Sequence, residues 1–250
     1  MNNYKLINGD CIKEMQKLID KDIKVDLILT DLPYGTTSCK WDNIIPFEPM
    51  WDCIDKLSKE KTPTVLFGQE PFSSHLRLSN LKNYRYDWYW NKTRPTGHLN
   101  AKKQPMRKIE EIMVFYKKQC PYYPQGLIAG EFNNNRPAKS RKKKGKHVYG
   151  EEKPIKLSKY TNYPNNVLEY SNSNNKTIHP TQKPVEMLEY LIRTYTNEGD
   201  TVLDFTMGSG STGVACLQTN RNFIGIELEP KYYDIAKQRI NEAKTQGRLI

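Results

Sequence analysis

The chain has 250 residues and a formal net charge of +11, which suggests a polyanionic partner, although a basic solvated surface carries the same charge. Its length permits one large α/β domain, or one domain with a sizeable insertion. Five scattered cysteines without a C-x-x-C pair argue against a disulfide framework or a zinc site and suit a reducing compartment. No apolar run predicts a signal segment or a membrane span, so we expect a cytoplasmic protein without a membrane partner.

The first predicted elements lead to an acidic loop. Residues 5–10 are predicted to form a short strand, and residues 11–19 have the spacing of an amphipathic helix that Asp10 is expected to cap. A buried strand is predicted for residues 25–29. It is followed shortly by four residues that form a D-L-P-Y stretch, Asp31, Leu32, Pro33 and Tyr34. This stretch stands where a strand ends, and open α/β sheets bind their ligands at that place.

The chemistry of the D-L-P-Y stretch is more specific than its position. A simple strand-ending turn also accounts for Asp and Pro, which are ordinary turn residues. However, Asp31 offers a carboxylate, and Leu32 offers a main-chain carbonyl whose direction Pro33 restricts by favouring an extended conformation before it. Tyr34 adds a flat aromatic face. Two acceptors beside a stacking surface suit an amino group on a planar heterocycle.

Further α/β elements follow the D-L-P-Y stretch. Helices are predicted for residues 47–57 and 71–78, with a short apolar strand at 64–68 between them. Alternating apolar residues predict two neighbouring strands, at 84–92 and 109–116. Two such strands late in a parallel series suggest an antiparallel edge.

Residues 119–176 have a different composition. They contain few apolar runs and several Asn pairs, so we expect an insertion that is partly disordered without its partner. A basic run within it includes Arg136, Lys139, Arg141, Lys142, Lys143 and Lys144. Such a run is usually a solvated loop, and the sharper interpretation is an arm that contacts phosphates.

Residues 177–250 carry the signals of a nucleotide site. The H-P-T-Q-K-P sequence at 179–184 precedes a predicted helix whose first turn tolerates the last proline. A strand at 201–205 leads into a glycine-rich turn and a helix, which is the opening of a nucleotide-binding βαβ unit. A second strand, at 222–227, ends in an acid at the customary distance for binding ribose hydroxyls. The glycine pattern alone is weak, because dinucleotide sites and plain turns share it.

Together these motifs resemble the amino-methylating DNA methyltransferases, which modify adenine N6 or cytosine N4. The D-L-P-Y stretch is similar to the D-P-P-Y motif of that family, and H-P-T-Q-K-P is similar to the motif before its cofactor strand. The glycine turn resembles D-x-F-x-G-S-G-T, with Phe205 displaced by one position from the usual D-P-F spacing. Leu32 replaces the first proline but has the same main-chain carbonyl. The catalytic motif precedes the insertion and the cofactor turn follows it, as in the β-type permutation of the family.

The resemblance implies roles for individual residues. Asp31 and Leu32 accept hydrogen bonds from the amine of a flipped base that stacks on Tyr34. Lys183 pairs with the methionine carboxylate of S-adenosylmethionine, and Asp10 lies near its adenine. The implied catalytic set is Asp31, Leu32, Pro33 and Tyr34, and the implied cofactor set is Asp10, Lys183, Asp204, Phe205, Gly208, Gly210 and Glu227.

The resemblance also implies a fold and its partners. We expect a Rossmann-like methyltransferase fold with a mostly parallel seven-stranded sheet, an antiparallel edge and helices on both faces. Residues 1–118 then form the catalytic half, residues 119–176 an inserted target-recognition segment, and residues 177–250 the cofactor-binding half. The expected partner is double-stranded DNA, no metal is expected, and a homodimer and a cognate restriction enzyme are left open.

Two other classes explain fewer of the residues. A nicotinamide-dependent oxidoreductase would use the glycine turn but leaves the D-L-P-Y stretch and the basic run unexplained. A non-catalytic nucleic-acid-binding module explains the charge but not the cofactor motifs. Within the methyltransferases, Asp31 favours adenine N6, because members that act on cytosine usually carry Ser there. Cytosine N4 is the alternative, and an RNA substrate also fits.

Overall fold

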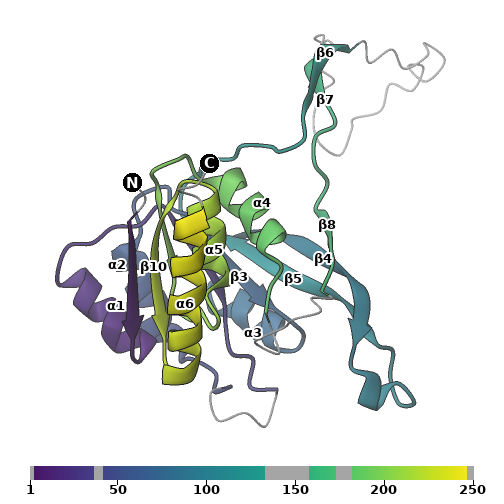
Figure 1. Cartoon of the computed structure of the whole chain (residues 1–250). Coiled ribbons are helices and arrows are strands. Elements are labelled where there is room, and N and C mark those ends of the chain that lie inside the picture. The colour runs from purple at the N-terminus through teal and green to yellow at the C-terminus, as the bar shows by residue number, and fades with distance from the viewer. Residues whose placement is uncertain (1–2, 37–41, 133–157, 173–181, 247–250) are drawn as a thin grey trace. The chain divides into compact units, whose positions relative to one another are not determined.

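The computed structural model describes residues 3–36, 42–132, 158–172 and 182–246 (Figure 1). The chain falls into two compact units, of which the larger comprises residues 1–123 and 166–250 and the smaller residues 124–165. The smaller unit is shorter than the insertion expected at 119–176, because both ends of that segment belong to the larger unit.

An eight-stranded sheet forms the centre of the larger unit. Its strands lie in the order β1 (Tyr4–Asn8), β10 (Asn222–Glu227), β9 (Thr201–Asp204), β2 (Leu27–Asp31), β3 (Thr64–Gly68), β5 (Arg107–Phe115), β4 (Tyr84–Thr96) and β8 (Val167–Tyr170). All of these strands run in one direction except β5. The expected α/β class with a mostly parallel sheet is therefore confirmed, but the sheet has eight strands and not seven.

The antiparallel strand lies inside the sheet and not at its edge. β5 pairs with β3 on one side and with β4 on the other, antiparallel to both. The edge beyond β4 is formed by β8, which runs parallel to β4. β8 comes from the segment that was expected to be wholly an insertion. Its four residues, V-L-E-Y, are too few for strand alternation to be recognised in a polar segment.

Helices cover both faces of this sheet (Figure 1). The first set of helices is α1 (Cys11–Ile19), α2 (Phe47–Leu57) and α3 (Phe72–Ser79), and the second set is α4 (Val185–Tyr195), α5 (Ser211–Gln218) and α6 (Pro230–Gln246). Ile28 and Leu66 pack with the first set, whereas Leu29 and Phe67 pack with the second set. Because successive side chains of a strand point to opposite faces, a strand covered on both sides is apolar at nearly every position.

None of the described helices combines the length and apolarity that crossing a bilayer needs.

The strand order reverses between β9 and β2. From β9 the chain continues through α5 to β10 on one side, and from β2 it continues through α2 to β3 on the other. Since α5 and α2 lie on opposite faces, the carboxyl ends of β9 and β2 flank the point where open α/β sheets form their ligand crevice.

The remaining described elements are short. A 3₁₀ turn, η1 (His98–Asn100), lies in the connection between β4 and β5. In the smaller unit, β6 (Ile128–Phe132) and β7 (Ser158–Thr161) form an antiparallel pair.

Candidate active site

A pocket of about 720 Å³ opens at the carboxyl ends of the parallel strands. Its walls come from the ends of β1, β2, β9 and β10, together with residues of β4 and β5. The catalytic and cofactor motifs, which are far apart in the sequence, therefore meet at one cavity. Ten of the predicted site residues line it, namely Asp10, Asp31, Leu32, Pro33, Tyr34, Lys183, Asp204, Phe205, Gly208 and Glu227.

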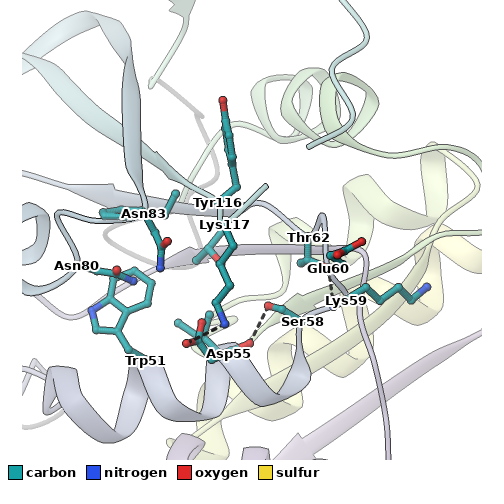
Figure 2. Close-up of a pocket in the computed structure, with 13 residues that line it drawn as sticks. Trp51, Asp55, Ser58, Lys59, Glu60, Thr62, Asn80, Asn83, Tyr116 and Lys117 are labelled. Carbon is teal, nitrogen blue, oxygen red and sulfur yellow. Dashed lines mark hydrogen bonds and ion pairs between the residues drawn. The ribbon is translucent and has the colours of Figure 1, made fainter. Parts of the chain in front are cut away.

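A second pocket lies at the opposite end of the sheet, and Figure 2 shows the residues that line it. It has a volume of about 20 Å³, which is room for about one water molecule, and it lies beside Thr64 at the start of β3. A cation in its wall is already paired, because Lys117 Nζ lies 3.0 Å from Asp55 Oδ2. This pocket is too small for a base or a nucleotide, so the larger pocket is the candidate site.

Asp31 is the last residue of β2, and both of its carboxylate oxygens accept hydrogen bonds. The Tyr34 hydroxyl donates to Asp31 Oδ1 over 2.6 Å, and Lys183 Nζ donates to Asp31 Oδ2 over 2.5 Å. The Tyr34 ring packs against Phe72 at the start of α3, with 5.2 Å between the ring centroids. The carboxylate is thus held in one direction by a hydroxyl and an ammonium group. The predicted pairing of Lys183 with the cofactor carboxylate stays a prediction, since its contacts in the structure are with acidic side chains.

Two buried residues that the sequence motifs do not include extend these contacts. Glu110 on β5 pairs through Oε1 with Lys183 Nζ at 2.9 Å and through Oε2 with Lys92 Nζ of β4 at 2.6 Å. Glu110, Lys92 and Lys183 are 5%, 7% and 8% exposed, respectively. We call Asp31, Glu110, Lys92 and Lys183 the charge quartet. With two carboxylates and two ammonium groups, the quartet places no net charge in the pocket wall.

Burial and pairing act in opposite directions on the charge quartet. Burial raises the pKa of Asp31, although the Lys183 ammonium opposes the shift. Burial by itself would raise the pKa of Glu110, but Lys183 and Lys92 together lower the pKa of that carboxyl below its ordinary value. Burial disfavours the charge of Lys183, yet the two neighbouring carboxylates raise its pKa overall. Burial raises the pKa of Tyr34 as well, so its hydroxyl remains a hydrogen-bond donor.

The sequence does contain a signal for Glu110 and Lys92. Lys92 alternates with Trp88 and Trp90 along β4, and Glu110 alternates with Ile112 along β5. These apolar residues belong to one buried cluster, so the two charged residues occupy inward positions. A buried charge is costly unless it is paired. A Lys and a Glu at inward positions of two neighbouring predicted strands therefore indicate a buried ion pair.

Asp204, at the end of β9, is held by neutral donors. The Thr30 hydroxyl donates to Asp204 Oδ1 over 2.7 Å, and the Thr206 main-chain N–H donates to the same oxygen over 3.2 Å. Burial raises the pKa of Asp204 to about 6. The Thr206 hydroxyl also donates to the main-chain carbonyl of Asp31 over 2.8 Å, so the loop after β9 is tied to the end of β2.

Glu227, at the end of β10, is held in a similar way. The main-chain N–H groups of Gly208 and Glu229 donate to its carboxylate, each over 2.8 Å. Burial raises the pKa of Glu227. Gly208 has a φ of +52°, and a Cβ built there would meet no atom within 4 Å. The turn therefore leaves open space beside the Glu227 carboxylate.

Gly210 does not have the predicted position. It does not line the pocket but precedes α5 with a φ of +78°. A Cβ on Gly210 would lie 2.8 Å from the Cβ of Ala236 on α6. A side chain at Gly210 would therefore collide with α6 and not fill the pocket, and the contact of Gly210 with the cofactor stays a prediction. Gly210 is needed for the left-handed conformation and for the close approach of α6.

Three further residues line the pocket near the ends of β1 and β9. Asp10 caps α1 as expected, since its Oδ1 accepts from the Lys13 main-chain N–H over 3.0 Å. Phe205 packs in the core under the first set of helices and also reaches the pocket. Cys11 lines the pocket too, but burial raises the pKa of its thiol to about 12, which argues against a nucleophile.

The predicted phosphate-contacting cations, Arg136, Lys139, Arg141, Lys142, Lys143 and Lys144, lie outside the described residues, and their role stays a prediction. Within the described residues, no group of three His, Cys, Asp or Glu side chains is placed to hold a metal ion.

Known proteins resemble this chain along nearly its whole length. The profile of a family described as DNA methylase matches residues 25–238. The Type II methyltransferase M2.LlaDCHI of Lactococcus lactis subsp. cremoris is 38% identical over 98% of this chain and 92% of that protein. The DNA adenine methyltransferase YhdJ of Escherichia coli (strain K12) is 27% identical over 95% of this chain and 83% of that protein.

Solved structures share the fold. The M1.HpyAVI–SAM complex has a TM-score of 0.65 and 24% identity, covering 95% of this chain and 99% of that one. The cytosine-N4-specific PvuII DNA methyltransferase has a TM-score of 0.65 and 15% identity, covering 99% of this chain and 93% of that one. The family profile covers most of the chain, and its motifs meet at one pocket. The chain therefore belongs to the N6/N4 DNA methylase family, whose methyl donor is S-adenosylmethionine.

Proposed function

We propose that this DNA methyltransferase methylates N6 of adenine in double-stranded DNA, and that Asp31 and Leu32 hold the target amine. The observation that carries the proposal is the position of Asp31. It ends β2 in the wall of the large pocket, and Tyr34 and Lys183 hold its carboxylate in one direction. The roles of the other site residues follow from their places around it.

The β9–β10 side of the pocket fits S-adenosylmethionine. The open space beside Gly208 lets a ligand approach the backbone closely. Glu227 presents a carboxylate suited to ribose hydroxyls, and Asp204 presents one suited to the amino group of the methionine part. Asp10, in the wall after β1, is assigned to the surroundings of the cofactor adenine. When bound, S-adenosylmethionine supplies a methyl group attached to a positively charged sulfur.

Asp31 has room for another hydrogen bond in addition to those it already accepts. A carboxylate has about four acceptor positions, and Tyr34 and Lys183 use two of them. One N–H of a target amine is accepted by the Asp31 carboxylate and the other by the Leu32 main-chain carbonyl. These two bonds orient the amine and make its lone pair more available. The raised pKa of Asp31 suits its carboxylate to hold the proton that the nitrogen loses.

A base amine inside a duplex cannot reach this pocket, so the target base has to leave the stack. Tyr34 lines the pocket, and one side of its ring is covered by Phe72. We assign the opposite side of the ring to the flipped base. Stacking of a base on an aromatic side chain contributes roughly 1–3 kcal/mol, which offsets part of the cost of unstacking.

The choice of adenine also depends on Asp31. Members of the family that act on cytosine usually carry Ser at this place, and a carboxylate accepts more strongly than a hydroxyl. The relative from Escherichia coli is named a DNA adenine methyltransferase, whereas the structure named as cytosine-N4-specific is only 15% identical. Cytosine N4 is the second candidate, because its exocyclic amine makes the same two hydrogen bonds.

Nucleoside mass spectrometry of DNA incubated with the chain and S-adenosylmethionine tests the proposal. We expect N6-methyladenine with the unchanged chain and none with a folded Asp31→Ala variant. N4-methylcytosine without N6-methyladenine would overturn the choice of base but leave the transferase activity in place. Sequencing of the methylated positions in DNA from an expressing host identifies the recognition sequence.

We assign sequence recognition to the inserted segment 119–176 and phosphate contacts to its basic run. Neutralising Lys142, Lys143 and Lys144 together is expected to weaken binding to all DNA sequences alike. The slope of log affinity against log salt should fall by roughly 0.9 for each phosphate that is no longer neutralised.

A cognate restriction enzyme is the proposed partner, since the relative from Lactococcus lactis is named a Type II methyltransferase. DNA from an expressing host should then resist cleavage by an enzyme of the same specificity. Light scattering of the purified chain tests for a homodimer.

A further inference from the structure

A hairpin between β4 and β5 extends beyond the sheet (Figure 1). We call residues 93–109 the hairpin tip, and every residue in this span is exposed. The connection carries η1 between the two strands. A two-stranded hairpin without a core of its own is marginally stable in water. The hairpin tip packs on no core of its own, so its side chains are free to contact a partner.

The hairpin tip is basic and contains no acidic residue. Among the described residues, no carboxylate pairs with any of its five cations. Three lysines near the amino end of the sheet behave differently, because Lys59, Lys117 and Lys118 each contact an acidic side chain. A cluster of cations without counter-charges suits a polyanion. The five cations of the hairpin tip are Arg94, Lys102, Lys103, Arg107 and Lys108.

The hairpin tip adjoins the mouth of the large pocket. Lys92 and Glu110, which stand next to its two ends in the sequence, line the pocket, and so does Thr96 within it. Arg107 Nη1 donates to Gln69 Oε1 over 2.6 Å, and Gln69 is another residue of the pocket wall. A base that enters the pocket therefore passes beside the hairpin tip.

The strand leading into the hairpin tip is fixed by Asn172. The Arg94 main-chain N–H donates to Asn172 Oδ1 over 2.9 Å, and the Arg94 carbonyl accepts from Asn172 Nδ2 over 2.8 Å. Asn172 also lines the pocket. Asn172 therefore both lines the pocket and fixes the start of the hairpin tip.

Leu99, in η1, is 96% exposed. A single exposed leucine is common on protein surfaces and by itself indicates nothing. This one follows Gly97, whose φ is +88°, and stands among the five cations of the hairpin tip. DNA-binding proteins use apolar side chains of this kind as wedges between bases.

We propose that the hairpin tip is an arm that contacts duplex DNA beside the flipped base. Its cations bind the phosphates, and Leu99 occupies the space that the target base leaves in the stack. The inference rests on the proposed function, because it requires a base in the pocket. Filling the vacated space lowers the cost of keeping the base out of the stack. A lipid surface or an acidic protein would also match the charge, but neither accounts for a basic arm at the mouth of a pocket that suits a base amine.

The phosphate contacts are tested with two triple variants that remove the same charge. Lys102→Ala/Lys103→Ala/Lys108→Ala removes cations of the hairpin tip, and Lys59→Ala/Lys117→Ala/Lys118→Ala is the control at the other end of the sheet. For the hairpin variant, the slope of log affinity against log salt should fall by about 0.9 for each phosphate that is no longer neutralised, whereas the control should keep the slope of the unchanged chain. Equal slopes for the two variants would overturn the assignment.

The wedge is tested with Leu99→Ala. The control is Leu78→Ala on α3, because Leu78 is also an exposed leucine (71%). It lies two residues before Asn80, which lines the small pocket and not the large one. After the recognition sequence has been mapped, 2-aminopurine at the target position reports unstacking. We expect Leu99→Ala to show less unstacking and about a tenfold lower kcat/KM on paired DNA, since opening a base step costs a few kcal/mol. A mismatch at the target should restore its rate, because an unpaired base is easier to flip.

The outcomes separate the wedge from the proposed function. If Leu99→Ala keeps the kcat/KM of the unchanged chain on paired DNA, or loses as much on mismatched DNA, Leu99 is not a wedge. If the unchanged chain transfers no methyl group to either duplex, the proposed function fails, and the hairpin inference fails with it.

Discussion

The two sides of the large pocket hold their carboxylates by different means. On the side of Asp31 and Glu110, to which we assign the reaction and which we call the reaction side, Lys183 contacts both carboxylates and Lys92 contacts Glu110 as well. On the side of Asp204 and Glu227, to which we assign the cofactor and which we call the cofactor side, the carboxylates accept only from hydroxyl and main-chain N–H groups of the described residues. The pKa values follow this difference at Glu110 and Asp204 but not at Asp31, where burial raises the pKa despite the contact with Lys183. The two lysines lower the pKa of Glu110 despite its burial, whereas burial raises the pKa of Asp204 to about 6.

The difference suggests a division of labour within one pocket wall. A carboxylate paired with an ammonium group is fixed in position, which suits a step that depends on exact orientation. When a buried carboxylate is held only by neutral donors, the cost of taking its charge out of water is only partly offset. A ligand that brings positive charge and N–H or O–H donors lowers this cost further. Changes on the reaction side should therefore act on the transfer rate, and changes on the cofactor side should act on affinity for S-adenosylmethionine.

The largest expected effect is that of Asp31→Asn. The amide has nearly the shape of the carboxylate but lacks its charge and part of its accepting capacity. We expect the single-turnover rate of methyl transfer to fall by on the order of 10²–10³-fold, the size seen when one positioned polar group is removed from an active site. Calorimetry should show unchanged affinity for S-adenosylmethionine. Asp55→Asn, beside the small pocket, is the matched control and should leave the rate as it is.

Glu110→Gln tests the charge quartet. It leaves Lys183 paired with Asp31 and removes the carboxylate that Lys92 contacts, and breaking a buried pair from one side costs about 3–5 kcal/mol of unfolding free energy. Denaturant unfolding measures this loss. The double variant Glu110→Gln/Lys92→Met restores charge neutrality and should recover part of the stability. Strictly additive losses in this cycle would show that the quartet is not a coupled unit.

Glu227→Ala should act on cofactor binding. Its carboxylate is the proposed acceptor for ribose hydroxyls, and hydrogen bonds to a charged group contribute about 1.5–3 kcal/mol, so affinity should fall by roughly 10- to 100-fold. Glu229→Gln is the control, since its side chain does not line the pocket. A loss of rate at saturating S-adenosylmethionine without a loss of affinity would place Glu227 on the reaction side and break the comparison.

The smallest effect is a pH dependence at Asp204. The pKa of Asp204 in the folded chain is about 6, above the ordinary value of ~4. The protonated form of Asp204 therefore stabilises the fold fully below pH ~4, and this stabilisation is lost as the pH rises through about 6. The cofactor amino group needs the ionised acceptor, so affinity for S-adenosylmethionine should fall by up to about tenfold per pH unit below 6. Calorimetry between pH 5 and pH 8, set around that value, measures the fall. Asp204→Asn should flatten the curve, and an unchanged curve would assign the titration to another group.

Much of the larger unit could be predicted from local sequence patterns. The helix at 47–57 and the strands at 64–68 and 222–227 have the predicted bounds. The helix has amphipathic spacing and the strands are short apolar runs, and each of these patterns ends at polar or turn residues. The places of Asp31, Asp204 and Glu227 at strand ends follow from the same patterns. A parallel sheet then brings these carboxyl ends to one edge.

The features that were missed depend on contacts between distant segments. β8 is a strand only because its four residues pair with β4, and no local pattern reports that. The contact of Lys183 with Glu110 joins the cofactor motif to a strand of the other half. The alternation along β4 and β5 indicates that Glu110 pairs with Lys92, but it does not indicate the contact with Lys183. Gly210 shows a third limit, because a glycine in this turn serves either a ligand or a neighbouring helix. The spacing of glycines in the sequence is the same in both cases.

The most direct test of this division compares Asp31→Ala and Glu227→Ala in one single-turnover experiment. Methyl transfer to duplex DNA is followed at concentrations of S-adenosylmethionine that saturate each variant. We predict that Asp31→Ala loses transfer although it binds the cofactor, and that Glu227→Ala transfers at nearly the rate of the unchanged chain once saturated. Equal losses of rate in the two variants, or transfer retained by Asp31→Ala, would contradict the assignment of the reaction to the Asp31 side of the pocket.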